Sequence, residues 1–473
     1  MKLSIAANLL NVDLSPSFGS IVFTGVSSDT RTIQPNDLFV AISGPHFDGH
    51  HFIAQAAEKK AAAIMIDRAC DTTLPYLRVD NTIKAMGILA AAHRAQFNIP
   101  IIGVTGSCGK TSTRALIASI LSECAPTLFS ESSFNNHIGV PLTVLRLNAQ
   151  HQYAVIEIGA NHFGEIADLT HIVKPDVALI INAAEAHLDG FGDVAGVCKA
   201  KGEIFQGLAP NGIAILNADD PHLTDWEAMI AAQFSLGSTE NVEAKKPTIL
   251  RFSLSKPVDV YAQEISLNTD NTSQFILVTP QGKTRIHLPL LGRHNISNAL
   301  AAAAAAFAVH IPLNAIQAGL EKVSAVQKRL NIHEIGDDIY LIDDSYNANP
   351  LSVMAAIDTL ATQSGKKILV LGDMKELGEQ TEAAHFQIGE KAKQAGVDLL
   401  LTYGDASQFC ANGFGDQAKH FTDQAALIAL LKTRLVSPMN ILIKGSRSME
   451  MEKIVAALNP IPQFLPPTIK NII

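Results

Sequence analysis

One stretch, residues 100–124, constrains the fold of this chain more than any other. It reads PIIGVTGSCGKTSTRALIASILSEC: an apolar run over 101–104 has strand composition, and an apolar-periodic helix pattern begins at Lys110. A glycine-containing turn over 106–109 joins the two. This order predicts a phosphate-binding loop. The loop amides and the helix N-terminus carry partial positive charge, and glycine lets the backbone approach the phosphates closely.

The side chains beside this turn fit the same prediction. Lys110 would reach the β- and γ-phosphates of a nucleotide, and the hydroxyl of Thr111 or Ser112 would bind Mg²⁺. The spacing GxxGKTS departs from the strict GxxxxGK[ST] pattern, because Val104 stands where the first glycine belongs. This stretch alone therefore leaves open a simple turn between strand and helix with an exposed lysine.

Length and composition restrict the class of protein. A chain of 473 residues is too long for one hydrophobic core and predicts about three domains. The longest strongly apolar run, residues 299–309, is about half of the ~20 residues that span a bilayer, so no membrane insertion is expected. The N-terminus lacks the pattern of a secretion signal, and a net charge of -9 without a lysine and arginine cluster argues against a nucleic-acid partner. The five cysteines are scattered, with no CxxC pair, which indicates reduced thiols in a cytoplasmic protein.

Residues 1–84 are expected to form a small α/β domain. Strand patterns lie at residues 21–26, 38–42, 61–67 and 76–79. The polar turn after the first strand pattern holds hydroxyls, a carboxylate and a guanidinium, on Ser28, Asp29, Thr30 and Arg31. Such a cluster can bind a diphosphate or a sugar, because the arginine fork matches phosphate oxygens. A polar hairpin loop is the alternative, and the cluster by itself favours that one.

Alternating strand and helix patterns fill the rest of the chain, which predicts βαβ units in mainly parallel sheets. Four extended stretches between residues 248 and 290 predict antiparallel strands attached to the central sheet, and an alanine-rich helix follows over 294–309. The alternation resumes after Pro312 without a second phosphate loop. We therefore expect a central domain over 85–311 and a C-terminal α/β domain over 312–473.

Polar residues follow two predicted strands that should end beside the phosphate loop. Glu157 ends the strand pattern YAVIEIG, and the next strand leads into INAAEAHLDGFG with His187. Parallel strands end at one sheet edge, where ligands of open α/β sheets bind, and oxygen ligands suit Mg²⁺. His187 alone would be interpreted as a loop histidine bonded to backbone. Lys201 lies in a helix pattern, and periodicity alone favours a surface lysine there.

Nine segments, in order along nearly the whole chain, resemble the Mur ligase family of peptidoglycan synthesis. They are SSDTRTIQPNDLFVAISG, GVTGSCGKTS, SFNNHIGVPLTVL, EIGANHFGEI, NAAEAHLDGFG with KAKGEIF, LLGRHNISNALAA, DDSYNANP, LGDMKELGE and KGSRSMEME. The resemblance implies three domains: a UDP-sugar domain, a central ATP domain and a C-terminal Rossmann-like domain. It also implies a monomeric ATP-dependent ligase that adds D-alanyl-D-alanine to UDP-N-acetylmuramoyl-tripeptide through an acyl phosphate.

The resemblance further implies roles for individual residues. ATP would be held by Gly106, Ser107, Cys108, Gly109, Lys110, Thr111, Ser112, Asn295, Arg329, Asp344, Asn347 and Asn349. Two Mg²⁺ ions would be bound by Thr111, Glu157, His187 and Lys201, with Lys201 carbamylated so that it offers oxygens to a metal. The UDP-sugar peptide would contact Ser28, Asp29, Thr30, Arg31, Asn135, Asn136 and Thr143. For the cluster over residues 28–31, the resemblance therefore favours ligand binding over a simple polar hairpin loop. The catalytic set would be Lys110, Glu157, His187 and Lys201.

Three positions depart from the family pattern. Cys108 stands where asparagine is usual, His137 where an acidic residue is common, and Lys328 where glycine often precedes the arginine. Two alternatives stay open. One is a related ligase that adds a single amino acid, or adds glutamate to folate, although DDSYNANP and NNHIGVP favour dipeptide addition. The other is a P-loop kinase or a nucleotide-binding regulatory module.

Overall fold

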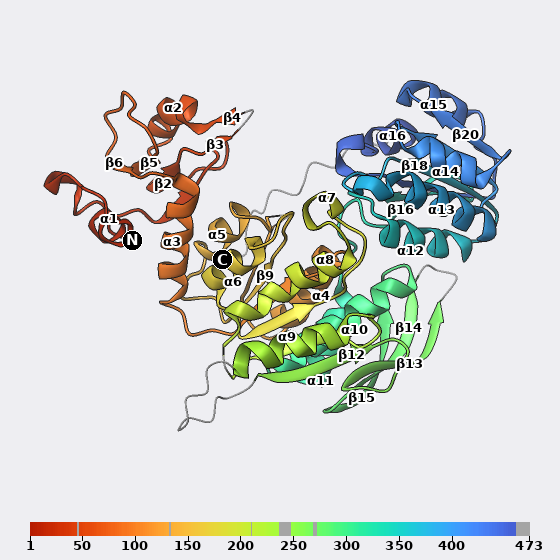
Figure 1. The fold of residues 1–473 in the computed structure, drawn as a ribbon, viewed down its shortest axis with the longest axis horizontal. Helices are drawn as coiled ribbons and strands as arrows, with labels where there is room; N and C mark the ends of the chain where they lie inside the picture. The colour runs from red at the N-terminus through yellow and green to blue at the C-terminus, as the bar shows by residue number, and fades with distance from the viewer. Residues whose placement is uncertain (45–46, 132–133, 210, 236–246, 268–271, 460–473) are drawn as a thin grey trace.

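Three principal β-sheets follow one another along the chain, each covered by helices (Figure 1). The structure is a computed structural model and describes residues 1–44, 47–131, 134–209, 211–235, 247–267 and 272–459. Figure 1 shows the N-terminal unit, in red and orange, and the C-terminal unit, in blue, on opposite sides of the central one. The α/β fold class with three sheet-centred units is therefore confirmed.

The N-terminal sheet is entirely parallel. Its order is β1 (Gly25–Ser27), β2 (Asp37–Val40), β5 (Ala63–Ile66) and β6 (Tyr76–Arg78). Alternate residues of the buried strands face α1 (Leu3–Leu10) and α3 (Thr82–Arg94) on one side and α2 (Ile53–Glu58) on the other. Because β1 and β2 run parallel, the polar turn between them is not a hairpin loop. The first strand is also shorter than predicted, beginning at Gly25 and not at Ile21.

The central sheet has nine strands. Its order is β15 (Gly282–Leu288), β14 (Ser273–Thr279), β13 (Val260–Leu267), β12 (Thr248–Ser253), β11 (Ile213–Asn217), β10 (Val177–Ile180), β7 (Ile101–Thr105), β9 (Tyr153–Glu157) and β8 (Thr127–Phe129). The strands from β13 to β8 are parallel, and β13, β14 and β15 pair antiparallel. The prediction of four antiparallel strands was thus wrong for β12, which extends the parallel ladder of β11.

Helices cover both faces of the central sheet. On one face lie α4 (Lys110–Ser122), α10 (Arg293–Ala308) and α11 (Leu313–Lys322). On the other lie α5 (Gly139–Val144), α6 (Glu165–Val173), α8 (Val194–Gly202) and α9 (Leu223–Ser235). The alanine-rich helix α10 is almost wholly buried, because its small side chains allow close contact with α4 and the sheet. Although α11 begins after residue 311, it packs on α4 and β15, and the domain boundaries stay a prediction.

The C-terminal sheet has six strands with one antiparallel edge. Its order is β16 (Asn331–Gly336), β17 (Ile339–Asp344), β21 (Met439–Lys444), β18 (Lys366–Gly372), β19 (Leu399–Tyr403) and β20 (Ala418–Phe421). β16 pairs antiparallel with β17, and the strands from β17 to β20 are parallel. One face is covered by α12 (Pro350–Ala361), α13 (Thr381–Gln394) and α14 (Ser407–Phe414), the other by α15 (Gln424–Lys432) and α16 (Glu452–Leu458).

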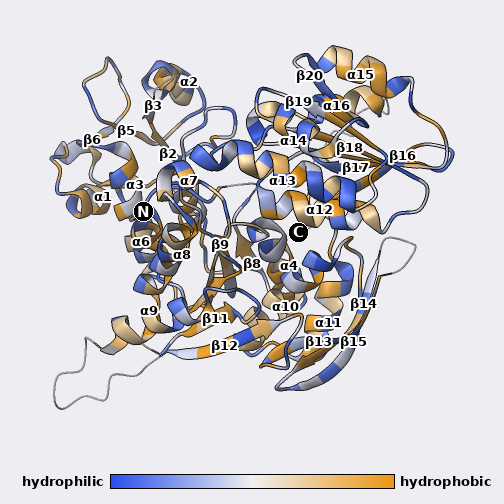
Figure 2. Cartoon of the chain, turned by 45° about the vertical axis from the view of Figure 1, so that its right-hand side comes forward, coloured by the Kyte–Doolittle hydropathy of each residue, from blue (hydrophilic) through white to orange (hydrophobic). Residues whose placement is uncertain are grey.

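Apolar residues concentrate on the sheets and on the inner faces of the helices, as the orange colouring of Figure 2 shows. This pattern is that of sheets packed on both sides, for which parallel strands are typical. Among the helices of the described ranges, none is long and apolar enough to cross a membrane.

Candidate active site

The predicted phosphate loop lies where the strand order of the central sheet reverses. β7 stands between β9 and β10, and the loop follows the carboxyl end of β7. Glu157 ends β9, and the segment with Asn182 and His187 follows β10. In open α/β sheets, ligands bind in the crevice at such a point.

Contacts from the segment after β10 fix the loop. The amide of Ser107 donates to Asn182 O at 3.1 Å, and the amide of Cys108 donates to Asn182 Oδ1 at 2.9 Å. The Ser107 hydroxyl donates to Ala184 O at 3.1 Å. Gly109 has φ +82° and directly precedes α4, so a backbone that only glycine adopts easily turns the chain into the helix. The loop is therefore shaped by its own backbone and by the segment that follows β10.

The Lys110 amine lies over the phosphate loop. Its Nζ donates to Gly106 O at 2.6 Å and to Ser107 O at 3.4 Å. Burial lowers the pKa of Lys110, and the nearby Glu157 carboxylate opposes that shift. From this position the amine can donate a hydrogen bond to a phosphate oxygen in the loop with little change in the direction of the side chain.

Glu157 is the centre of a buried polar cluster and is only 1% exposed. Its Oε1 accepts from Asn135 Nδ2 at 2.8 Å and from Thr111 Oγ1 at 3.3 Å. Its Oε2 has no hydrogen-bond donor among the described residues and lies 3.9 Å from Arg114 Nε. Arg329 Nη2 donates to Thr111 Oγ1 at 3.2 Å. Mg²⁺ prefers oxygen ligands. The carboxylate of Glu157, with one oxygen that accepts no hydrogen bond from the described residues, and the adjacent hydroxyl of Thr111 fit that preference.

Lys201 is buried, contrary to its interpretation as a surface lysine. The side chain on α8 is 1% exposed, and Nζ has no hydrogen-bond partner within the described part of the chain. Nζ lies 5.5 Å from the ring centroid of Phe191. Burial, and secondarily the charge of Lys110, lowers the pKa of Lys201 to about 7. An amine with that pKa is substantially neutral near pH 7 and can act as a nucleophile.

The C-terminal unit contacts the central unit at three predicted site residues. Cys108 Sγ donates to Asn349 Oδ1 at 3.1 Å, and Asn349 also caps the N-terminus of α12. Arg329 reaches Thr111 from the segment before β16, and its guanidinium lies 4.3 Å from the ring centroid of Tyr346. His187 Nδ1 lies 2.5 Å from Glu376 Oε2. Residues of the C-terminal unit therefore contact the phosphate loop and the segments next to it.

Two other predicted nucleotide residues contact the buried Lys444, Asp344 through an ion pair and Asn347 through its backbone carbonyl. Asp344 Oδ2 accepts from Lys444 Nζ at 2.5 Å, and the same Nζ donates to Asn347 O at 2.9 Å. Lys444 thereby fixes the start of the DDSYNANP segment.

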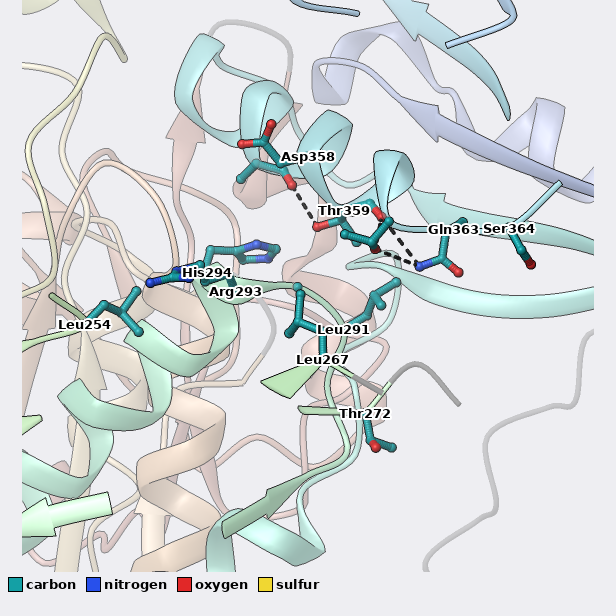
Figure 3. A pocket seen from close by; sticks show the side chains of 13 residues that line it. Leu254, Leu267, Thr272, Leu291, Arg293, His294, Asp358, Thr359, Gln363 and Ser364 are labelled. Carbon is teal, nitrogen blue, oxygen red and sulfur yellow. Dashed lines mark hydrogen bonds between the residues drawn. The ribbon is translucent and has the colours of Figure 1, made fainter. Parts of the chain in front are cut away.

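Two pockets of about 590 Å³ each lie beside the N-terminus of α10. Figure 3 shows the first, with Arg293 and His294 from α10 on one side and Asp358 and Thr359 from α12 on the other. Burial lowers the pKa of His294 to about 4, so this ring is neutral. The second pocket is lined by residues that include Asn295 and Arg329.

The predicted UDP-sugar residues of the N-terminal unit make contacts with one another and with the fold. Arg31 is exposed and forms a two-point contact with Asp29, with Nε–Oδ1 at 3.0 Å and Nη2–Oδ2 at 2.6 Å. Thr30 is buried and donates to Gln55 Oε1 at 3.0 Å, while Ser28 is half-buried. The Arg31 guanidinium is thus partly neutralised by its neighbour.

The other predicted substrate residues lie in or before α5. Asn136 Oδ1 accepts from the amides of Ile138 and Gly139. Thr143 is buried in α5, and its hydroxyl donates to Gly139 O at 2.8 Å within the helix. Asn135, by contrast, points to Glu157 and joins the buried cluster.

Comparison with known proteins identifies the family. Three family models match successive parts of the chain: the Mur ligase family catalytic domain over residues 22–100, the Mur ligase middle domain over 104–306 and the Mur ligase glutamate ligase domain over 328–447. The chain is 44% identical to UDP-N-acetylmuramoyl-tripeptide--D-alanyl-D-alanine ligase of Escherichia coli, over 97% of this chain and 98% of that protein. The chain belongs to the Mur ligase family. The protein of the same name from Haemophilus influenzae is 40% identical over 92% of this chain and 93% of its own.

A solved structure agrees with this membership. The crystal structure of MurF from Acinetobacter baumannii is similar with a TM-score of 0.83 and 37% identity, over 92% of this chain and 93% of that one. The three-domain architecture expected of a Mur ligase is thus supported by structure as well as by sequence.

The structure brings together Lys110, Thr111, Glu157, Asn135 and Arg329, and it adds residues that the sequence reasoning did not select. Arg114 lies one helical turn after Lys110 on α4, and its Nε and Nη1 have no acceptor in the described ranges. The i, i+4 spacing is the signal that could have identified it. Asn298 joins the site by accepting from Thr113 and donating to Asn295. Glu376 could not be found from spacing, because only the tertiary fold brings it to His187.

Gly109→Ala is expected to lower both the free energy of unfolding, by about 2–3 kcal/mol, and the affinity for ATP. A Cβ at this position would lie 2.5 Å from Asn298 Oδ1, in a backbone with φ +82°. Gly164→Ala is the matched control, since Gly164 has φ +86° but no atom within 4 Å of the new Cβ. Thermal melts and nucleotide titrations measure both effects. Equal losses in the two variants would mean that the contact with Asn298 is unimportant.

Proposed function

We propose that the chain is an ATP-dependent ligase that adds D-alanyl-D-alanine to UDP-N-acetylmuramoyl-tripeptide. The observation that carries this proposal is the match of nearly the whole chain to relatives of that name at 44% and 40% identity. The geometry of the phosphate loop and of the Glu157 cluster supports it independently, because phosphate-binding, metal-binding and cationic groups converge there.

The first step is phosphoryl transfer to the tripeptide carboxylate. The carboxylate oxygen bonds to the γ-phosphorus of ATP, the bond to the β-phosphate oxygen breaks, and ADP leaves. Negative charge spreads over the phosphoryl oxygens during this step. The cations that surround Glu157 and Thr111, namely Lys110, Arg114 and Arg329, are in position to stabilise that charge.

Two Mg²⁺ ions would be held by Thr111, Glu157, His187 and a carbamylated Lys201, and when bound they neutralise charge on the phosphates. The carbamate forms when the neutral Lys201 amine attacks CO₂: a C–N bond forms and a proton is released. The buried amine, with a pKa of about 7 and no hydrogen-bond partner in the described part of the chain, supports this modification. His187 contacts Glu376 in this structure, so its role as a ligand requires that contact to open.

The second step joins the two building blocks. The amine of D-alanyl-D-alanine attacks the acyl phosphate, the amide bond forms, and phosphate leaves with the proton accepted by solvent or a neighbouring base. The acyl phosphate hydrolyses easily, so the site must exclude water. Closure of the C-terminal unit over the loop, through Cys108 with Asn349 and Arg329 with Thr111, serves that purpose.

Each proposed domain holds one reactant. Residues 1–84, with Ser28, Asp29, Thr30 and Arg31, would bind the UDP-sugar, and residues 85–311 would bind ATP. Residues 312–473 would supply Asp344, Asn347 and Asn349 to the nucleotide and bind the dipeptide. We assign the adenosine to the pocket lined by Asn295 and Arg329. We expect a cytoplasmic monomer, in keeping with five free cysteines.

An ADP-release assay on the purified full chain tests this function. With ATP and Mg²⁺, we expect release only when UDP-N-acetylmuramoyl-tripeptide and D-alanyl-D-alanine are both present, together with an amide product. Acceptors carrying diaminopimelate or lysine as the third residue determine which one is preferred. Release that instead requires a single amino acid or glutamate would favour a related ligase. ADP release with a phosphorylated but never amidated product would favour a kinase and overturn the proposal.

A further inference from the structure

Three potential metal ligands converge on the side of the central unit between α8 and α9. One ligand atom each from Cys198, His222 and Asp225 lies within 4.8 Å of the others. Cys198 is on α8, His222 directly precedes α9, and Asp225 lies in the first turn of α9. None of the three belongs to the nucleotide site described above.

The surrounding structure fixes the relative positions of these three side chains. The indole Nε1 of the buried Trp226 donates to Cys198 O at 3.1 Å, which ties α9 to α8. His222 Nδ1 lies 2.9 Å from Asp225 Oδ2, and the amide of His222 donates to Asp220 Oδ1 at 2.9 Å. The site is therefore built on two packed helices and a fixed turn.

The chemistry of the set selects the type of cation. A thiolate, an imidazole and a carboxylate are the ligands that Zn²⁺ accepts in tetrahedral sites, whereas Mg²⁺ takes oxygen ligands almost exclusively. At Zn–ligand distances of about 2.0–2.3 Å, the ligand atoms of a tetrahedral site lie about 3–4 Å from one another. The three atoms here, within 4.8 Å of one another, are close to that arrangement. Three protein ligands leave the fourth position to water.

Accessibility and charge also suit a cation. The Cys198 side chain is buried, whereas that of Asp225 is 56% exposed and opens the site to solvent. Burial, and the carboxylates of Asp225 and Asp220, raise the pKa of the Cys198 thiol to about 12. The same negative charges attract a divalent cation, which on binding would displace the thiol proton.

We propose that Cys198, His222 and Asp225 bind one Zn²⁺ ion, separate from the Mg²⁺ of the nucleotide site. Binding there connects α8, which carries Lys201 one turn after Cys198, to the loop before α9. Asp220 of that loop accepts from the Ala183 amide at 2.9 Å, so the zinc site is adjacent to the segment that leads to His187. Zinc is expected to stabilise the central unit by linking these elements.

Titration of the full chain with Co²⁺ tests the site, because a cobalt–thiolate bond gives a charge-transfer absorption in the near ultraviolet that oxygen ligands do not give. We expect the band to saturate at one equivalent and to vanish when Zn²⁺ is added. Cys198→Ala should abolish it. Cys108→Ala and Cys410→Ala should retain the absorption band. These two controls show that the band arises neither from the thiol in the phosphate loop nor from another buried thiol.

His222→Gln and Asp225→Asn keep the thiol and change side chains that are not deeply buried, so both variants should fold. Each is expected to weaken Co²⁺ binding at least about tenfold, since loss of even supporting contacts costs metal sites about that much. Zn²⁺ should raise the melting temperature of the wild type and not that of Cys198→Ala or His222→Gln. An unchanged affinity in both variants, or a band that survives in Cys198→Ala, overturns the proposal.

Discussion

Replacing Lys110 with alanine is expected to abolish turnover, with kcat lowered by at least about 10³-fold. The Lys110 amine lies 2.6 Å from Gly106 O at the mouth of the phosphate loop, where the transferred phosphoryl group would develop negative charge. ADP release with both substrates measures the loss, and a nucleotide titration separates it from weaker ATP binding.

Lys322→Ala is the control for removal of a lysine. Lys322 lies on α11, its side chain is exposed, and its Nζ contacts Glu123 at 2.7 Å on the surface. This variant should retain wild-type turnover, since exposed ion pairs contribute little. If Lys110→Ala turned over as fast as Lys322→Ala, the phosphate loop would not be the site of the reaction.

Lys201→Met is expected to lower kcat by about 10³-fold while leaving the protein at least as stable as the wild type. Methionine has similar length and fills the same buried space, but it cannot form a carbamate. Among the described residues the buried wild-type amine has no hydrogen-bond partner, so its charged form costs stability. Activity and stability should therefore change in opposite directions, as is typical of functional residues. A Lys201→Met protein with full activity would exclude the carbamate.

The pH dependence of the wild type gives a second measurement of the same group. The pKa of Lys201 is lowered from 10.5 to about 7 in the folded state. The folded state thus disfavours the charged amine. The resulting destabilisation is fully present below pH 7 and disappears as the pH rises toward 10.5. Below pH 7 the amine is mostly protonated, so the neutral form that reacts with CO₂ becomes scarce.

Turnover by protein depleted of CO₂ should therefore recover with added bicarbonate faster at pH 8 than at pH 6. Lys201→Met should show no response to bicarbonate at either pH. A wild-type recovery that is independent of both bicarbonate and pH would argue that the amine itself, and not its carbamate, is the functional group.

The sequence correctly predicts the strand, turn and helix over 101–122 and the position of Glu157 at the end of a neighbouring strand, because both depend on local order and on the rule that parallel strands end at one edge. The burial of Lys201 could not be predicted in that way. Helix periodicity places Lys201 among surface lysines, whereas in the fold its side chain is buried and its amine lies beside the ring of Phe191. The parallel pairing of β12 is also a tertiary result, since an isolated extended stretch carries no information about the direction of its neighbour.

The contact of His187 with Glu376, and the exposed pair of Arg31 with Asp29, illustrate a further limit. In each case the sequence supplies a residue type suited to a ligand, while a neighbouring side chain in the fold already partners it. Whether such a residue binds a ligand or its neighbouring side chain depends on distances in the folded protein, and the order of residues in the sequence does not give these distances.

The close packing of helix α10 limits which amino-acid substitutions this chain can accept. Seven of its alanines, Ala299 and Ala301 to Ala306, are fully buried between α4 and the sheet, and its first turns carry Asn295 and Asn298 to the phosphate loop. Each added methylene along this helix would push α4 outward by overpacking, at about 1–3 kcal/mol, and would shift the loop at the head of α4 with it. Substitutions at these buried alanines should therefore lower activity before they unfold the protein, although the alanine side chains themselves contact α4 and the sheet and not the proposed nucleotide site.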